Sequence, residues 1–209
     1  MTKSNSLKSL SSIGQSVWLD YIDRSLIRNG KLTQLVRDGL RGLTSNPSIF
    51  LEAIGTSDDY DDSIKEIVAS NSTIDNETLF EMLAVKDIQM AADILRDVYD
   101  DTNGTDGFVS FEVSPHLAHN TSKTISEAKR LWETIDRPNL MIKVPATKEG
   151  TPAIENLIGM GINVNITLMF SVAHYESVAN AYIADSTSVK ERAKGMGKIG
   201  AARGIGFVL

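Results

Sequence analysis

The strongest constraint on the fold is a repeated alternation of short apolar runs with longer segments of helical periodicity. Apolar residues three or four positions apart mark the helical segments at 24–38, 48–100, 124–135, 151–161 and 172–184. The short apolar runs lie between them at 17–22, 41–47, 108–113, 140–146 and 162–170. Such an alternation with short links favours a parallel sheet or barrel with helices outside. We therefore predict an α/β fold.

Local signals predict where several elements begin and end. One helix is expected over 24–38, and Gly39 suits its C-terminus. Thr124 has capping-box spacing to a glutamate and is expected to begin a helix. Thr151, followed by a proline, is expected to cap the next helix. The tail at 204–209 is expected to form a further strand.

Length and charge narrow the class of protein. A chain of 209 residues suffices for one domain with a sizeable core, so a single domain over 1–209 is expected. The net charge of −6 offers no electrostatic footprint for nucleic acid. The polar N-terminus lacks the apolar core of a signal peptide, and no apolar run reaches membrane-spanning length. These features predict a cytoplasmic protein that binds neither nucleic acid nor membrane.

Metal and cofactor motifs are absent from the sequence. The chain has no cysteine, which excludes disulfides, thiol catalysis and thiolate metal sites. His116 and His119 are three positions apart, but no carboxylate pair completes a zinc pattern. The glycine-rich stretch at 195–206 matches neither a phosphate-binding loop nor a dinucleotide fingerprint. We expect no metal and no cofactor.

Two ionisable residues interrupt expected strands. Lys143 lies in LMIKVPA, and desolvation in a strand would favour the neutral amine, which is the nucleophile for a carbonyl carbon. Glu112 lies in FVSFEV and could move protons beside such a lysine. The alternatives are a strand-end lysine that reaches solvent and a glutamate that forms an ordinary salt bridge.

Uncharged and acidic polar residues extend this set. Asn163, Asn165 and Thr167 share one face of an expected strand and need partners, either a polyol substrate or a structural polar network. Asp20 lies in VWLDYI, where it could also cap a helix. Asn46 precedes a proline, a combination that also occurs in ordinary turns.

Taken together, five segments resemble the transaldolase family, specifically its longer bacterial branch. They follow one another in family order and cover roughly residues 12–184. The segments are SVWLDYIDRSLI, GLTSNPSIF, VSFEVSP, RPNLMIKVPAT and INVNITLMFSVAHY. The resemblance implies a (β/α)8 TIM barrel with the active site at the carboxyl ends of its strands.

The resemblance also implies a role for each polar residue. Lys143 matches the lysine that forms a Schiff base with a ketose phosphate, such as sedoheptulose 7-phosphate or fructose 6-phosphate. Asp20 matches the residue that takes the proton of the C4 hydroxyl, and Glu112 the acid/base that acts through a water. Thr167 matches the residue that helps hold this water. Asn46 and Asn165 match the two residues that form hydrogen bonds with the bound dihydroxyacetone moiety.

The chain differs from this branch at its C-terminal end. Members are considerably longer, so the barrel is expected to be truncated, with about six of its eight strands. The phosphate-binding serine–arginine pairs of the family are not found in the 209 residues. Two other functions therefore remain: a smaller fructose-6-phosphate aldolase-like enzyme, or an inactive fragment. The resemblance leaves a homodimer open, with sugar phosphates as the expected partners.

Overall fold

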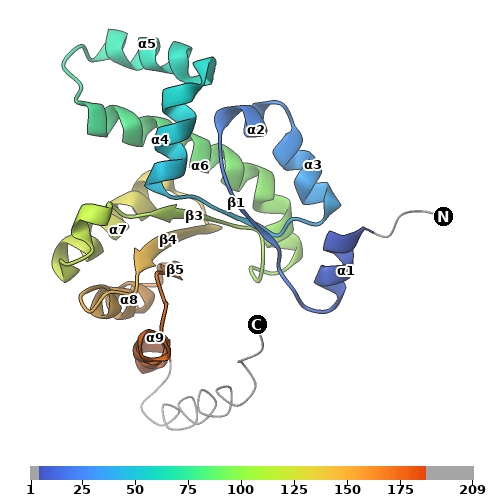
Figure 1. The fold of residues 1–209 in the computed structure, drawn as a ribbon, viewed down its shortest axis with the longest axis vertical. Helices are drawn as coiled ribbons and strands as arrows, with labels where there is room; N and C mark the ends of the chain where they lie inside the picture. The colour runs from blue at the N-terminus through green and yellow to red at the C-terminus, as the bar shows by residue number, and fades with distance from the viewer. Residues whose placement is uncertain (1–4, 187–209) are drawn as a thin grey trace. The chain divides into compact units, whose positions relative to one another are not determined.

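The computed structural model describes residues 5–186, in which strands and helices alternate and paired strands run parallel (Figure 1). Five strands form a sheet in the order β1-β2-β3-β4-β5. They are β1 Trp18–Asp20, β2 Gly42–Thr44, β3 Phe108–Glu112, β4 Leu140–Pro145 and β5 Val164–Thr167. The predicted α/β class is confirmed, and the parallel sheet is consistent with an incomplete (β/α)8 barrel. The strand expected at 204–209 lies outside the described residues.

Helices follow the strands along the chain. The α-helices are α1 Ser6–Ser12, α2 Arg24–Arg28, α3 Lys31–Asp38, α4 Pro47–Thr56, α5 Asp61–Ser70, α6 Asn76–Asp101, α7 Thr121–Ile135, α8 Gly150–Gly159 and α9 Val172–Ser186. Two 3-10 turns, η1 Asp58–Tyr60 and η2 Pro115–Leu117, complete the described elements. Within residues 5–186, no helix combines the length and the apolar character needed to cross a bilayer.

The chain divides into two compact units. The first comprises Met1–Glu112 and Trp132–Met141, and the second comprises Val113–Leu131 and Ile142–Leu209. Strands β1 to β3 belong to the first unit, and β5 with most of β4 to the second. Each unit has buried apolar residues of its own, such as Leu43 in the first and Ile154 in the second.

Three predicted helix boundaries were wrong. The single helix expected over 24–38 is two helices, because Gly30 adopts a left-handed conformation (φ 78°) between them. Thr124 does not begin a helix: it lies inside α7 and its hydroxyl donates to the carbonyl of Leu117 at 2.9 Å. Thr151 likewise lies inside α8, whose first amide donates instead to the hydroxyl of Thr147 at 2.9 Å.

Other boundaries follow the expected chemistry. Gly39 ends α3 in a left-handed conformation (φ 115°), as predicted. The helical segment expected over 48–100 includes α6, and the side chain of Asp75 caps α6 by accepting the amide of Thr78 at 2.9 Å. Helix α1 was not predicted, although Asn5 gives it a side-chain cap. Its short polar sequence has no apolar periodicity to reveal it.

The core of the first unit lies between the sheet and the helices that follow β2. Phe50 of α4 is fully buried and contacts Phe111 of β3 edge-on, with ring centroids 5.9 Å apart. Phe80 of α6 also contacts the Phe50 ring edge-on, with ring centroids 6.3 Å apart. Tyr99 of α6 contacts Phe108 at 5.3 Å. These edge-to-face contacts join both ends of β3 to helices.

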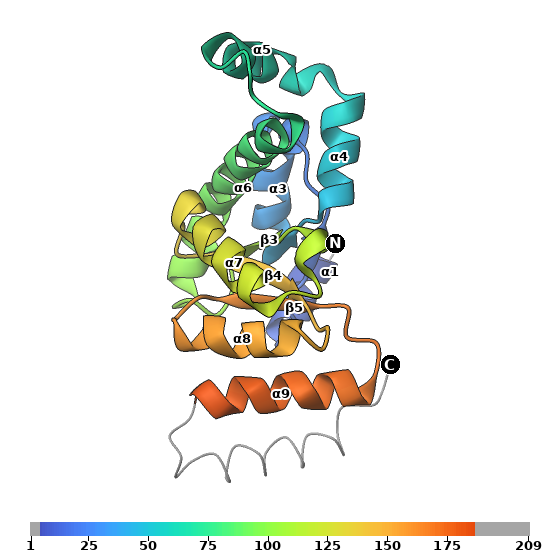
Figure 2. The same cartoon turned by 90° about the vertical axis from the view of Figure 1, so that its left-hand side faces the viewer.

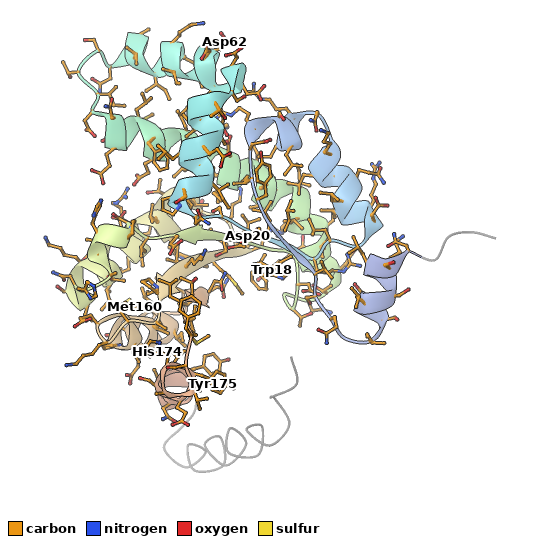
Figure 3. All side chains as sticks on the ribbon, in the orientation of Figure 1. Trp18, Asp20, Asp62, Met160, His174 and Tyr175 are labelled. Carbon is orange, nitrogen blue, oxygen red and sulfur yellow. The ribbon has the colours of Figure 1, made fainter. Side chains whose placement is uncertain are left out.

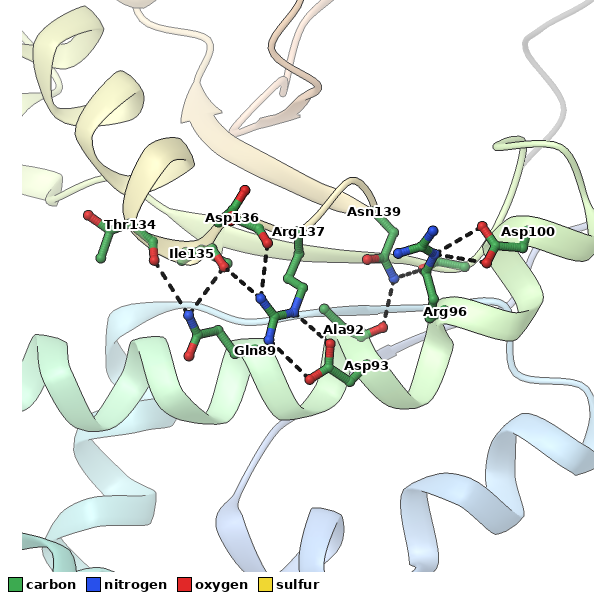
Figure 4. Close-up of polar contacts among 11 residues, drawn as sticks. Gln89, Ala92, Asp93, Arg96, Asp100, Thr134, Ile135, Asp136, Arg137 and Asn139 are labelled. Atoms are coloured by element: carbon green, nitrogen blue, oxygen red, sulfur yellow. Dashed lines mark hydrogen bonds and ion pairs between the residues drawn. The ribbon is translucent and has the colours of Figure 1, made fainter.

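Polar contacts fix α6 to the link between α7 and β4, all within the first unit (Figure 4). The side-chain amide of Asn139 donates to the carbonyls of Ala92 and Gly107 at 2.9 and 2.8 Å. Arg137 forms a two-pronged ion pair with Asp93, at 2.6 and 3.2 Å. Asn139 is fully buried, and its backbone carbonyl accepts the amide of Val109. Backbone and side-chain bonds together therefore hold this residue, which directly precedes β4.

A buried ion pair lies beside α2, also in the first unit. The Nε of Arg24 lies 2.9 Å from Oδ1 of Asp87, and the two side chains are 1% and 0% exposed. The hydroxyl of Tyr60 donates to Oδ2 of Asp87 at 2.8 Å, and the guanidinium lies over the Tyr60 ring. Arg24 also donates to Ser63 at 2.6 Å. No sequence pattern predicts the burial of these two charges.

Burial opposes the charge of this cluster. Desolvation raises the pKa of Asp87, against the hydrogen bond from Tyr60 and the charge of Arg24, which lower it. Desolvation, with the neighbouring charge of Asp87, also raises the pKa of Tyr60, so the phenol keeps its proton and remains a donor. A buried pair of this kind is compensated only while both charges are present.

In the second unit, β4 pairs in parallel with β5, and α8 and α9 lie side by side (Figure 2). Ile142 and Val144 of β4 and Ile154 and Leu157 of α8 are fully buried. The buried face of α8 therefore provides much of the apolar core of this unit.

Removing one charge of the buried pair should destabilise the chain more than removing both. Arg24→Met and Asp87→Leu each leave an uncompensated buried charge, which should lower the free energy of unfolding by about 3–5 kcal/mol. The double variant should lose less than either single variant. Urea unfolding followed by circular dichroism measures all three. Additive losses in the double variant would contradict this account.

Candidate active site

A row of polar side chains crosses the sheet of the first unit. Asp20 of β1 is in register with Thr44 of β2, which is in register with Ser110 of β3. Register partners of parallel strands point to the same face. One row earlier, Trp18 lies beside Gly42, where any Cβ would overlap the indole ring. The glycine therefore lets the indole cover the sheet just before the polar row.

Asp20 occupies the last position of β1 and is exposed (Figure 3). The alternative that Asp20 caps a helix is wrong, because Asp23 caps α2 by accepting the amide of Leu26 at 2.5 Å. Asp23 also accepts the hydroxyl of Tyr21 at 2.5 Å, and this bond raises the pKa of Tyr21 to about 12. The side chain of Asp23, and not that of Asp20, therefore makes these hydrogen bonds in the link to α2.

The side-chain amide of Asn46 has an oxygen that caps a helix and a nitrogen that takes no part in the cap. Its Oδ1 accepts the amide of Ile49 at 3.0 Å as the N-cap of α4, so the turn interpretation is confirmed in the form of a helix cap. The cap uses Oδ1 and does not involve the side-chain nitrogen of Asn46. Among the described residues, that nitrogen makes no hydrogen bond, and Asn46 is half-buried.

Glu112 ends β3 and is half-buried, two positions after the fully buried Ser110. The backbone of Ser110 holds the exit of β2, because its carbonyl accepts both the amide of Ser45 at 3.2 Å and its hydroxyl at 2.8 Å. The extended backbone of Asn46 follows directly. The carboxyl ends of β2 and β3 are thereby fixed to each other.

In the second unit, Lys143 of β4 is in register with Asn165 of β5, and Pro145 with Thr167. The side chains of Lys143 and Asn165 therefore share a face, on neighbouring strands spaced about 4.8 Å apart. Thr167 lies one step further along that face. All three are half-buried, so Lys143 is neither enclosed in the core nor fully in solvent. The register therefore brings Lys143 to the strand face that carries Asn165 and Thr167.

The backbone gives a further connection to β4. The amide of Val113, the residue after Glu112, donates to the carbonyl of Lys143 at 3.1 Å, and both residues belong to the second unit. On the other side of β4, the amide of Ala146 donates to the carbonyl of Thr167 at 2.8 Å. Lys143 thus belongs to a strand held by hydrogen bonds on both edges.

The loops that follow β3 and β4 are joined within the second unit. The hydroxyl of Thr147 donates to the carbonyl of Ala118 at 2.5 Å, and that of Thr121 to the carbonyl of Glu149 at 2.7 Å. His119 lies 3.4 Å from the Glu149 carboxylate. The backbone amide of Glu149 and then His119 lower the pKa of this carboxyl, which belongs to a half-buried residue. These contacts fix the loops at the carboxyl ends of the two strands.

Two polar members of the face were not singled out from the sequence. Thr44 and Ser110 lie in the row of Asp20. Their positions in the sequence could have indicated this, because Thr44 lies two positions before Asn46 and Ser110 two positions before Glu112. The Thr44 hydroxyl is buried and, among the described residues, has no hydrogen-bond partner. No cluster of three or more metal-ligating side chains occurs in residues 5–186.

Comparison with known proteins identifies the family. The model of the family described as transaldolase/fructose-6-phosphate aldolase matches residues 17–200. The chain belongs to this family. The match includes every residue of the polar rows, so the resemblance seen in the sequence is confirmed.

Relatives within the family have nearly half of their aligned residues in common with this chain. Transaldolase 2 of Streptomyces avermitilis is 46% identical over 196 residues, which cover 93% of this chain and 52% of that protein. The transaldolase of Thiobacillus denitrificans is 46% identical over 180 residues, or 86% and 50%. That of Trichodesmium erythraeum is 47% identical over 181 residues, or 86% and 47%. The chain thus spans about half the length of these relatives.

The cap function of Asn46 predicts a selective effect on stability. Asn46→Asp keeps the acceptor for Ile49 and should leave the free energy of unfolding nearly unchanged, whereas Asn46→Ala should lower it by about 1 kcal/mol. Ser48→Ala, in the exposed first turn of α4, is the matched control. Thermal unfolding measures the series. Equal losses in the Asp and Ala variants would show that Oδ1 does not cap α4.

Proposed function

We propose that the chain supplies the Schiff-base half of a transaldolase, an enzyme that transfers a dihydroxyacetone unit from a ketose phosphate to an aldose phosphate. The observation that supports this most directly is the register of Lys143 with Asn165 at the carboxyl end of β4. This register supports the proposal because an amine and an amide side chain share one face on neighbouring strands, and barrel enzymes bind substrates near the carboxyl ends of such strands. Family membership and relatives named transaldolase agree with it.

The proposed reaction begins with attack of the neutral Lys143 amine on the ketone carbon of a donor such as fructose 6-phosphate or sedoheptulose 7-phosphate. Loss of water gives a protonated imine, and Glu112 supplies and removes protons through a water held with the help of Thr167. Asp20 then accepts the proton of the C4 hydroxyl. The C3–C4 bond breaks, its electrons pass to the imine as an enamine, and an aldose phosphate leaves.

The second half of the cycle reverses these steps on another substrate. The enamine attacks the aldehyde of an acceptor such as erythrose 4-phosphate, which forms a new C3–C4 bond, and hydrolysis releases the amine. Asn46 and Asn165 hold the hydroxyl groups of the bound three-carbon unit. Because the protonated imine accepts the electron pair, the proposed chemistry uses no metal and no cofactor.

The setting of this activity is part of the proposal. Transfer between sugar phosphates belongs to carbohydrate metabolism, in the pentose phosphate pathway of the cytoplasm. Both units would then be parts of one barrel domain spanning 1–209. Sugar phosphates are the proposed partners.

A second function is release of free dihydroxyacetone, as in a fructose-6-phosphate aldolase. The description of the matching family includes both activities, which is why this candidate remains. The two are separated by product analysis with fructose 6-phosphate in the presence of erythrose 4-phosphate. Sedoheptulose 7-phosphate indicates transfer, whereas free dihydroxyacetone indicates aldol cleavage.

Borohydride should trap the proposed imine on one lysine. The chain incubated with fructose 6-phosphate and borohydride should carry one covalent adduct, which peptide mass spectrometry locates at Lys143. Lys143→Arg should abolish it, whereas Lys123→Arg, on the exposed surface of α7, should not. A folded wild-type chain with no adduct would favour the inactive fragment.

Replacing each of the two carboxylates by its amide should affect a different step of the reaction. Glu112→Gln should slow formation of the adduct by about 100-fold or more, because imine formation requires proton transfer. Asp20→Asn should leave adduct formation nearly intact and slow C3–C4 cleavage by a similar factor. Single-turnover trapping and release of the aldose phosphate measure the two steps. Equal effects of both variants on both steps would contradict the assigned roles.

A further inference from the structure

The Arg24 cluster, defined as Arg24, Tyr60 and Asp87, does more than fill the core of the first unit. All three side chains are at most 1% exposed. A buried ion pair is often no more stabilising than well-packed apolar residues of the same volume. Its fixed geometry, however, can define the position of a neighbouring segment, and that segment is the exit of β1.

The contacts of Tyr60 show how the segment is held. Its hydroxyl donates to Oδ2 of Asp87 at 2.8 Å and accepts the backbone amide of Arg24 at 3.1 Å. Arg24 is the first residue of α2, where a backbone amide has no partner inside the helix. Asp87 therefore orients the phenol, and the phenol holds the first amide of α2.

This amide lies close along the chain to the proposed proton acceptor. Asp20 ends β1 and Arg24 begins α2, so only residues 21–23 separate them. Ile22, in the middle of that link, is fully buried. Asp20 itself is exposed and has no structural partner of its own among the described residues. The backbone on either side of the link must therefore fix where its carboxylate lies.

Tyr60 reaches α2 from the helices that follow β2. Helix α4 begins behind Asn46, and η1 with Tyr60 comes directly after it. Asp87 comes from α6, and Ser63 of α5 accepts Arg24 at 2.6 Å. The cluster thus joins the exit of β1 to the helices between β2 and β3. Asn46, a proposed substrate-binding residue, lies at the start of these helices.

We propose that Tyr60 and Asp87 are positioning residues for Asp20. The bond from the Arg24 amide to the Tyr60 hydroxyl fixes the β1–α2 link so that the Asp20 carboxylate can take the proton of the substrate's C4 hydroxyl. This inference rests on the proposed function. It predicts an effect on C3–C4 cleavage and none on imine formation, because Asp20 takes no part in the imine step.

Tyr60→Phe is the decisive variant, because it keeps the ring beneath the guanidinium and removes only the hydroxyl. Borohydride adduct formation at Lys143 should change by less than about twofold, and this adduct also reports that the protein is folded. Single-turnover release of the aldose phosphate should fall about tenfold or more, since a small misplacement of a reacting group is costly in rate. Tyr175→Phe, an exposed phenol 45% accessible on α9, is the control and should change neither rate.

A double-mutant cycle separates positioning from general loosening. In an Asp20→Asn background, Tyr60→Phe should cause no further loss of cleavage, because the group that it positions is gone. Multiplicative losses would overturn the proposal, and so would an equal fall of adduct formation and cleavage in Tyr60→Phe. A wild type that forms the adduct while Asp20→Asn leaves cleavage unchanged would also overturn it. Absence of the adduct in the wild type would instead reject the proposed function itself.

Discussion

The register of the parallel strands brings the polar side chains of this chain together in rows. In a parallel sheet each row of partners points to one face, so a polar residue near the end of one strand is placed beside those of its neighbours. Asp20, Thr44 and Ser110 form one such row in the first unit, and Lys143 with Asn165 forms another in the second. No loop needs to fold correctly for these side chains to meet their register partners.

Contacts around the polar rows hold the ends of the strands. Ser110 fixes the exit of β2 through its carbonyl, Asn46 caps the helix that follows, and Asn139 sets the beginning of β4. The buried pair of Arg24 and Asp87 fixes the exit of β1. The groups proposed for chemistry are half-buried or exposed at these strand ends.

Sequence periodicity predicted the strands and the long helices because apolar spacing is a local property. It also pointed to Lys143, Glu112 and Asp20 as polar residues within apolar runs. It failed at Gly30, where one residue in a left-handed conformation divides a helix whose apolar spacing continues across the break. It failed at Thr124 because Asn120, not the threonine, accepts the first-turn amide of Lys123. The ion pair of Arg24 and Asp87 joins residues 63 positions apart, which no local pattern encodes.

In the proposed function, one amine on β4 forms a covalent imine while the side chain of its register partner holds the substrate. A crystal structure of the borohydride-reduced complex with fructose 6-phosphate tests it most directly. We expect continuous electron density from Nζ of Lys143 to C2 of the sugar, with a substrate hydroxyl hydrogen-bonded to the side chain of Asn165. Density joined to another lysine, or a sugar turned away from Asn165, would contradict it.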